Sequence, residues 1–270
     1  MAKTTIPKNK SRQVGKTTPA SGDSAKGPLR KNSAEAFIRT LKTMTSVAEL
    51  KKIQGYFKSG EGQYAEGDIF IGVRMGQVFD LAKEFMDMDP VEIEMLLESP
   101  IHEARTGAVS IMDFQVRQKK TPESRKKELF DLYIRRHDRI NNWDLVDRAA
   151  IHVIGAYLAD KPRKILYKLA KSKNIWERRT AIVSTAYFLK SNDKSDTFKI
   201  AELLVKDGED LIHKAAGGWI RQAGKSDPSA LLAFLDRYAS IMPRVMLRFA
   251  IEQLDAKKKA AYMYMKEKKK

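Results

Sequence analysis

Residues 143–160 read WDLVDRAAIHVIGAYLAD, a stretch with the residue spacing of an amphipathic helix. Two asparagines come directly before it, and either can serve as the N-cap of a helix that starts at Trp143. Asp147 lies four residues after Trp143 and therefore on the same face of the helix. An acid thus stands beside a tryptophan on a face expected to enter the core. The apolar residues that continue this face are Ala150, Ile151, Ile154 and Leu158.

The two aspartates of this stretch differ in the partners that their own helix offers. Asp144 and Arg148 are four residues apart and are predicted to pair on one face. Asp147 has no such partner, and an unpaired carboxylate on an apolar face costs several kcal/mol. Two interpretations stay open, a buried pair with an arginine of the next helix pair or an active-site carboxylate. Arg179, on a partly apolar face, and Arg178, expected to face outward, are the candidate partners.

Apolar residues recur at intervals of three or four along most of the chain, without a convincing strand pattern. Residues 75–86 are followed by 89–99, and 101–118 by 122–137, as helix pairs. The Gly-rich residues 58–73 match no phosphate-loop motif and are interpreted as a connector. The helices predicted in this way span residues 34–44, 47–57, 75–86, 89–99, 101–118, 122–137, 143–160, 162–172, 175–189, 197–207, 210–224, 227–239 and 243–254.

The three tryptophans indicate a repeat. Trp143, Trp176 and Trp219 recur at intervals of about 33 to 43 residues, each near an arginine. A period near 40 residues with two helices in each unit is typical of HEAT-like solenoids. We therefore predict an all-α fold, an α-solenoid of antiparallel HEAT-like helix pairs. Their second helices are expected to line a concave groove.

Charge divides the chain into a folded part and two basic ends. Residues 1–31 carry eight basic side chains and one acidic, and residues 256–270 carry seven basic and one acidic. We predict a disordered basic N-terminal tail over 1–31, a single solenoid domain over 32–255 and a basic C-terminal tail over 256–270. The net charge of +17 favours a polyanion, nucleic acid above all, as partner, although basic tails also serve solubility.

Several classes of protein are disfavoured. The chain has no cysteine, which excludes disulfides and Cys-ligated metal sites, and this suits a reducing cytoplasm. Its four histidines match no metal-ligand spacing, so no cofactor or metal is predicted, and His152 is interpreted as a satisfied core residue. No GxSxG motif, secretory signal or apolar run of about 18 residues is present, so no membrane span is expected.

Four segments carry a resemblance: NNWDLVD (141–147), IWERRTAIV (175–183), IHKAAGGWIRQAGK (212–225) and PRVMLRFAIEQL (243–254). Together they resemble the bacterial DNA alkylation repair glycosylases of the HEAT-repeat type, the AlkD-like family, over about residues 35–255. The resemblance implies an α-solenoid whose basic groove wraps duplex DNA. It also implies release of cationic N3- or N7-alkylated purines, and a place in the bacterial cytoplasm near the nucleoid.

The resemblance also implies roles for four residues. Trp143 matches the tryptophan and Asp147 the catalytic aspartate of the family's W-D-x-V-D motif. Arg179 matches the arginine of the IW-x-x-R-x-A motif and is expected to grip a phosphate. The second active-site tryptophan of the family follows a K-A-x-G pattern directly, where this chain has Gly218 and then Trp219. Because one residue rotates a helical side chain by about 100°, either a bulge restores Trp219 or the aromatic wall is altered.

The expected chemistry suits these residue types. A cationic purine leaves without protonation, so the missing general-acid histidine is tolerable. Asp147 can stabilise the positive charge that develops on the sugar and position the attacking water. Tryptophan faces attract a cationic base or sugar, whereas Trp143 on spacing alone is also a plausible core anchor. Extrusion of the base into a pocket and capture without one both stay open.

Basic residues of the later helices are assigned to backbone phosphates, and Arg248 also falls in the family's final R-x-A-I motif. Solvated faces and salt bridges are the alternative for each of them. The predicted function is a monofunctional, metal-independent alkylpurine DNA glycosylase that acts as a monomer without an obligate protein partner. A DNA-structure-binding relative without catalysis and a protein-binding scaffold are the alternatives. The residues assigned to DNA are Arg178, Lys214, Arg221, Arg244 and Arg248.

Overall fold

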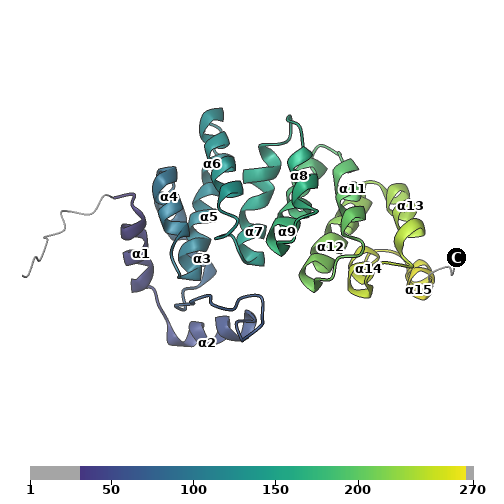
Figure 1. The fold of residues 1–270 in the computed structure, drawn as a ribbon, viewed down its shortest axis with the longest axis horizontal. Helices are drawn as coiled ribbons and strands as arrows, with labels where there is room; N and C mark the ends of the chain where they lie inside the picture. The colour runs from purple at the N-terminus through teal and green to yellow at the C-terminus, as the bar shows by residue number, and fades with distance from the viewer. Residues whose placement is uncertain (1–30, 266–270) are drawn as a thin grey trace, which may run out of the picture.

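The computed structural model describes residues 31–265, and its helices lie side by side in two layers (Figure 1). No strand occurs in this part of the chain, which holds a single isolated bridge between Ile69 and Ile101. One layer consists of α3 (Met75–Glu84), α5 (His102–Arg117), α7 (Trp143–Ala149), α9 (Ile175–Ser184), α12 (Asp210–Ser226) and α14 (Arg244–Ala250). The other consists of α4 (Pro90–Leu97), α6 (Glu123–Arg135), α8 (Lys164–Leu169), α11 (Ser195–Leu204) and α13 (Pro228–Tyr238).

Four further α-helices belong to the described part of the chain. The remaining helices are α1 (Ala34–Thr43), α2 (Val47–Tyr56), the four-residue α10 (Ala186–Leu189) and α15 (Ala256–Tyr264). Helix α15 falls within the predicted C-terminal tail, and its buried Tyr262 donates a hydrogen bond to Asp236 at 2.7 Å. The predicted N-terminal tail lies outside the described residues except for Lys31. The predicted all-α solenoid of helix pairs is confirmed, whereas the domain boundaries stay predictions.

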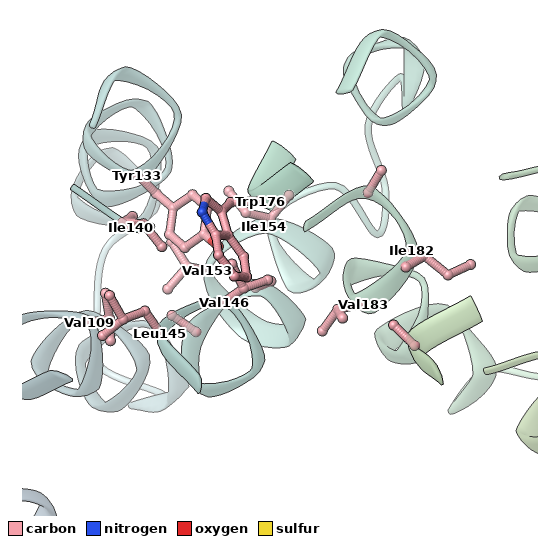
Figure 2. Packing of buried hydrophobic residues seen from close by; sticks show 14 of the residues in the cluster. Val109, Tyr133, Ile140, Leu145, Val146, Val153, Ile154, Trp176, Ile182 and Val183 are labelled. Atoms are coloured by element: carbon pink, nitrogen blue, oxygen red, sulfur yellow. The ribbon is translucent and has the colours of Figure 1, made fainter. Parts of the chain in front are cut away.

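Apolar side chains between the two layers form one continuous core. Figure 2 shows a central part of it, to which α7 contributes Leu145 and Val146 and α9 contributes Trp176. Each fully buried aliphatic side chain of this kind contributes roughly 1.5–3 kcal/mol. No helix in the described part of the chain is both long and apolar enough to cross a membrane.

Asparagine caps start the two helices that carry the central candidate residues. The Asn142 side chain accepts a hydrogen bond from the backbone N–H of Trp143 at 2.8 Å and so starts α7, as predicted. Asn174 accepts from the N–H of Trp176, also at 2.8 Å, and starts α9. Each cap satisfies an N–H that the helix itself leaves unpaired.

Two predicted helices are interrupted. The helix predicted over 143–160 is α-helical only to Ala149 and continues as a π-helix over Ala150–Ala156. In that π-helix Gly155 packs so closely on the next helix that a Cβ would lie 2.3 Å from the Ser184 carbonyl oxygen. The helix predicted over 175–189 is divided at Thr185, whose hydroxyl donates to the Ile182 carbonyl at 2.7 Å, a bond that bends helices.

The predicted pairing of helices is shifted by one helix. Helices α4 and α6, the second members of the predicted pairs, lie in the layer away from the candidate residues. Trp143, Arg179 and Trp219 lie on α7, α9 and α12 instead. In the units that place these helices second, α8 packs on α9 and α11 on α12, while α6 packs on the π-helix that continues α7.

The segment 58–73 is held rigidly by buried groups of α5. The carboxylate of Glu103, which is fully buried, accepts hydrogen bonds from the backbone N–H groups of Ile71, Gly72 and Val73 at 2.9–3.3 Å. Gly72 has φ +81°, and a Cβ on it would lie 2.3 Å from a backbone oxygen of Ser46. The segment is therefore a fixed part of the fold as well as a connector.

A buried ionic cluster ties the same segment to α5 and α7. The His102 ring contacts Asp68 through Nδ1 at 3.1 Å and Asp144 through Nε2 at 2.8 Å. Arg105 pairs with Asp68, and the Asn142 side chain donates to Asp68 at 2.9 Å. Burial disfavours the charged imidazole, but the carboxylates of Asp144 and Asp68 outweigh it and raise the pKa of His102 to about 9.

The predicted pair of Asp144 with Arg148 is wrong. Asp144 binds His102, 42 residues away in the sequence. Arg148 stacks on the rings of Phe79 and Phe114, both at 4.6 Å, and pairs with Asp113 at 3.3 Å. A packed guanidinium in contact with a buried carboxylate prevails over an exposed pair four residues apart, which contributes only about 0.3–0.5 kcal/mol.

Substitutions at two adjacent glycines of α12 test how closely this helix packs on α14. A Cβ at Gly217 would lie 2.4 Å from the Met246 carbonyl oxygen, whereas a Cβ at Gly218 would meet nothing within 4 Å. We expect Gly217→Ala to lower the free energy of unfolding by about 1–3 kcal/mol through overpacking against α14. Gly218→Ala should raise it by roughly 0.5–1 kcal/mol. Urea titrations measure both, and equal effects would contradict the close approach.

The ionic cluster predicts a pH-dependent stability. Folded His102 keeps its proton up to about pH 9, whereas the unfolded chain loses it near the ordinary value of 6.5. Its contribution is therefore complete below pH 6.5 and disappears as the pH rises to 9, a loss of about 3 kcal/mol. Urea titrations between pH 6 and 9.5 should show this fall in the wild type and a flatter profile in His102→Gln. Parallel profiles would contradict it.

Candidate active site

A bidentate ion pair between Asp147 and Arg179 forms the centre of the site. Arg179 donates from Nε and Nη2 to the two carboxylate oxygens of Asp147 at 2.9 and 2.7 Å. Its Nη1 donates to the Leu211 carbonyl at 2.6 Å. The Arg179 side chain is 9% exposed and that of Asp147 is 39% exposed. The pair therefore joins α7, α9 and α12 and leaves the carboxylate accessible.

This geometry combines the two interpretations of Asp147. Its partner is Arg179, one of the two candidates, but the carboxylate also borders two cavities. All three guanidinium nitrogens of Arg179 donate within the protein, so the expected phosphate grip is not what the structure shows. A two-point contact fixes the plane of a carboxylate, and Arg179 thus orients Asp147.

Arg178 does not face outward as predicted. It pairs with Asp207 at 2.6 Å and donates to the carbonyls of Ser172 and Lys173 at 3.0 Å. The side chains of Arg178 and Asp207 are only 14% and 5% exposed. Since these contacts occupy its guanidinium, Arg178 is not available as the predicted phosphate contact.

Trp143 borders the first cavity, which we call the aromatic cavity, of about 650 Å³. Its half-buried indole stacks on Phe57, with ring centroids 5.5 Å apart and planes 18° apart. The ring of Tyr56 forms a T-shaped contact with it, with ring centroids 5.8 Å apart. Tyr56 itself is 67% exposed. Trp143 is thus both packed and accessible. The aromatic cavity is lined by Tyr56, Lys58, Gly62, Gln63, Tyr64, Trp143, Asp147, Ile175, Arg179, Glu209, Asp210, Leu211 and Lys214.

On the other side of Asp147 lies the cationic cavity, of about 370 Å³. Helix α12 is continuous from Asp210 to Ser226, so no bulge compensates for the one-residue shift of Trp219. Trp219 nevertheless borders this cavity, beside the open space at Gly218. The cationic cavity is lined by Asp147, Arg179, Lys214, Ala215, Gly218, Trp219, Arg221, Gln222 and Phe249.

The other predicted cations differ in how far they are engaged. Lys214 pairs with Asp210 at 2.5 Å on an exposed surface, and half-buried Arg221 pairs with Glu252. Exposed Arg244 donates to the Met263 carbonyl. Exposed Arg248 donates to the Arg244 carbonyl at 3.3 Å and pairs with no acidic side chain of residues 31–265.

Neutral buried groups support the helix that carries Arg179. The hydroxyl of Thr180 contacts Tyr133 Oη at 3.0 Å and His137 Nε2 at 3.1 Å. Burial lowers the pKa of His137, and burial together with the nearby Asp147 raises the pKa of Tyr133 well above its usual range. Both side chains are therefore neutral at pH 7, and they join Tyr133 of α6 and His137, just after that helix, to Thr180 of α9.

Half-buried His152 contacts Asp113 through Nδ1 at 2.7 Å, so it is hydrogen-bonded as expected, but it lies at the edge of the core. In the described part of the chain no group of three or more His, Asp or Glu side chains is arranged to hold a metal ion. The metal independence of the chemistry stays a prediction.

Tyr56, Phe57 and Tyr64 were not among the predicted site residues. They belong to the end of α2 and to the segment 58–73, which was interpreted as a connector. The signal in the sequence was the density of aromatic residues in a stretch without helical periodicity. Regular surface connectors seldom need such residues, because large aromatic rings gain most when they are buried.

Comparison with known proteins shows the fold and the family that this chain shares. A solved structure described as a predicted DNA alkylation repair enzyme from Enterococcus faecalis superposes with a TM-score of 0.61 at 17% sequence identity. The match covers 79% of this chain and 98% of that one, and it shows a common fold. None of the curated proteins matches the chain. The sequence model of the family described as DNA alkylation repair enzyme matches residues 37–254, most of the chain, which therefore belongs to this family.

Proposed function

We propose that this chain is a monofunctional DNA glycosylase that hydrolyses the N-glycosidic bond of cationic N3- or N7-alkylated purines in duplex DNA. One observation carries the proposal: the carboxylate of Asp147 is held in a fixed plane by Arg179 and is still accessible from two cavities. A purely structural ion pair has no need of such access.

Asp147 would act on the sugar. As the bond between C1′ and the alkylated purine lengthens, the positive charge of the base passes to the sugar, and the purine leaves neutral. A carboxylate next to C1′ stabilises that charge more in the transition state than in the ground state. The same oxygens can accept a proton from the water that attacks C1′. Arg179 keeps the carboxylate oriented throughout, because it binds both oxygens.

Aromatic rings on both sides of Asp147 suit a cationic ligand. Trp143 and Tyr56 border the aromatic cavity, and Trp219 borders the cationic cavity. A cation over an aromatic face gains roughly 0.5–2 kcal/mol. A neutral purine or sugar gains no such charge-dependent attraction, so these walls favour cationic lesions over neutral ones.

Phosphates would be bound around the cavities. Lys214 and Arg221 line the cationic cavity, while Arg244 and Arg248 lie on the neighbouring helix α14. We assign these four side chains to the DNA backbone, where they contribute salt-sensitive, sequence-independent affinity. The chain would work as a monomer in the bacterial cytoplasm near the nucleoid, without a cofactor or an obligate protein partner.

One observation favours a second candidate, a DNA-structure-binding relative without catalysis. Gly218 stands where the resemblance places a tryptophan, and the space beside it is open. The loss of one aromatic wall would weaken the capture of a cationic lesion but leave the phosphate contacts intact. This candidate predicts binding to duplex DNA without release of a base.

Replacement of the catalytic carboxylate tests the mechanism. Asp147→Asn keeps the size of the side chain but removes the charge that stabilises the sugar cation. We expect the single-turnover rate of base release from methylated duplex DNA to fall by about 10²–10³. The dissociation constant for DNA should change little. Asp160→Asn, on a side chain that is 82% exposed, is the matched control and should release base at the wild-type rate. Equal rates for Asp147→Asn and wild type would refute the mechanism.

Arg248→Gln tests the assignment of phosphate contacts. Loss of one contact should weaken duplex binding and reduce the slope of log K against log salt by about 0.9. The control is Arg237→Gln on α13, in the other layer, where the side chain is 70% exposed and pairs with Glu202. Fluorescence anisotropy at several salt concentrations measures both. A similar loss in the two variants would mean that binding follows net charge alone.

A further inference from the structure

Residues far apart in the sequence build the aromatic cavity. Tyr56 and Tyr64 come from the N-terminal part of the chain, and Trp143 comes from the start of α7. The fit between these parts decides where the Trp143 ring lies relative to Asp147, one helical turn further on. Something must therefore fix the segment 58–73 against α7.

The contact between the two parts is a cluster of aromatic rings around a buried histidine. The His102 ring lies 4.7 Å from Phe70 and 5.1 Å from Phe57 between ring centroids. Phe57 in turn stacks on Trp143 at 5.5 Å. A displacement of His102 would thus be passed to Trp143 through a single intervening ring.

The residues on both sides of Trp143 bind the same cluster. Asn142, directly before it, donates to Asp68 at 2.9 Å. Asp144, directly after it, contacts His102 at 2.8 Å, and His102 contacts Asp68 at 3.1 Å. The backbone that carries Trp143 is therefore linked to the segment 58–73 directly through Asn142 and, by way of His102, through Asp144.

Charge makes this attachment specific. Asp68 and Asp144 supply two negative charges, which are balanced by Arg105 and by His102 when its ring is protonated. Their side chains are at most 13% exposed. Buried charges of this kind are tolerated only in a complete and well-aligned set, so they define one geometry and penalise others.

We propose that the bridge Asp68–His102–Asp144 is a positioning element of the active site, which holds Trp143 against Phe57 and in register with Asp147. This inference rests on the proposed glycosylase function. His102 touches no substrate in this role and acts through Trp143. The solenoid itself is held by the apolar core between its layers, so the bridge serves the site beyond its contribution to stability.

The test uses the full chain labelled with 5-fluorotryptophan. The chain has three tryptophans and therefore gives three ¹⁹F resonances, which single Trp→Phe variants assign. His102→Gln removes the bridge. We expect the Trp143 resonance to shift and broaden, while those of Trp176 and Trp219 stay in place. The single-turnover rate of base release should fall roughly tenfold or more, with less than a threefold change in DNA affinity, because misplacement penalises the chemical step.

Two further variants keep the test decisive. His102→Gln with Asp144→Asn restores neutrality to the cluster, so it should fold even if the single variant does not, and it too should displace the Trp143 resonance. Asp196→Asn breaks a comparable pair in the other layer, where Asp196 contacts Arg163 at 2.7 Å. This control should lose stability but keep the Trp143 resonance and the rate of base release.

An unmoved Trp143 resonance in both His102 variants would overturn the proposal, as would an equal loss of rate in Asp196→Asn. If the wild type releases no base, the glycosylase function fails. The fluorine spectra then still decide whether the bridge positions Trp143.

Discussion

The ion pair between Asp147 and Arg179 is the interaction on which the site depends. It spans three helices of one layer, because Arg179 of α9 binds Asp147 of α7 and the Leu211 carbonyl of α12. A charge at this depth would be costly if it were unpaired, and the bidentate contact removes that cost while leaving the carboxylate accessible. All three helices contribute to the lining of both cavities beside Asp147. The stability of this part of the fold and the proposed chemistry therefore both depend on the ion pair of Asp147 and Arg179.

The N-terminal segment completes the site, and buried charged side chains hold it in place, as the ion pair of Asp147 and Arg179 holds the three helices. Glu103 binds three consecutive backbone N–H groups, and His102 joins Asp68 to Asp144. Both residues lie on the first turn of α5. The terminal helices of a solenoid lack a neighbour on one side. At this end the buried contacts attach an irregular segment, whose position helix packing alone would not define. The aromatic rings beside Trp143 owe their place to this attachment.

Local periodicity was enough to predict the all-α solenoid and the start of α7 at Trp143. It also placed Arg179 on a partly apolar face, which is why Arg179 was a candidate partner of Asp147. Contacts between distant residues could not be read in this way. Asp144 binds His102 of α5, and Arg178 binds Asp207, 29 residues away. The segment 58–73 lacks helical periodicity, so periodicity could not place it beside the site, and only its aromatic residues distinguished it from an ordinary connector. The shift at Gly218 was visible, but only the unbroken helix α12 showed that no bulge compensates for it.

The central claim is that a fixed carboxylate, without a proton donor for the base, cleaves the bond to a purine that is already cationic. It is tested most directly by comparing two duplexes that differ only in one base, N7-methylguanine or hypoxanthine, with the wild-type chain. We expect release of the cationic N7-methylguanine and no release of the neutral hypoxanthine above the rate without protein. Release of both bases at similar rates, or of neither, would contradict it.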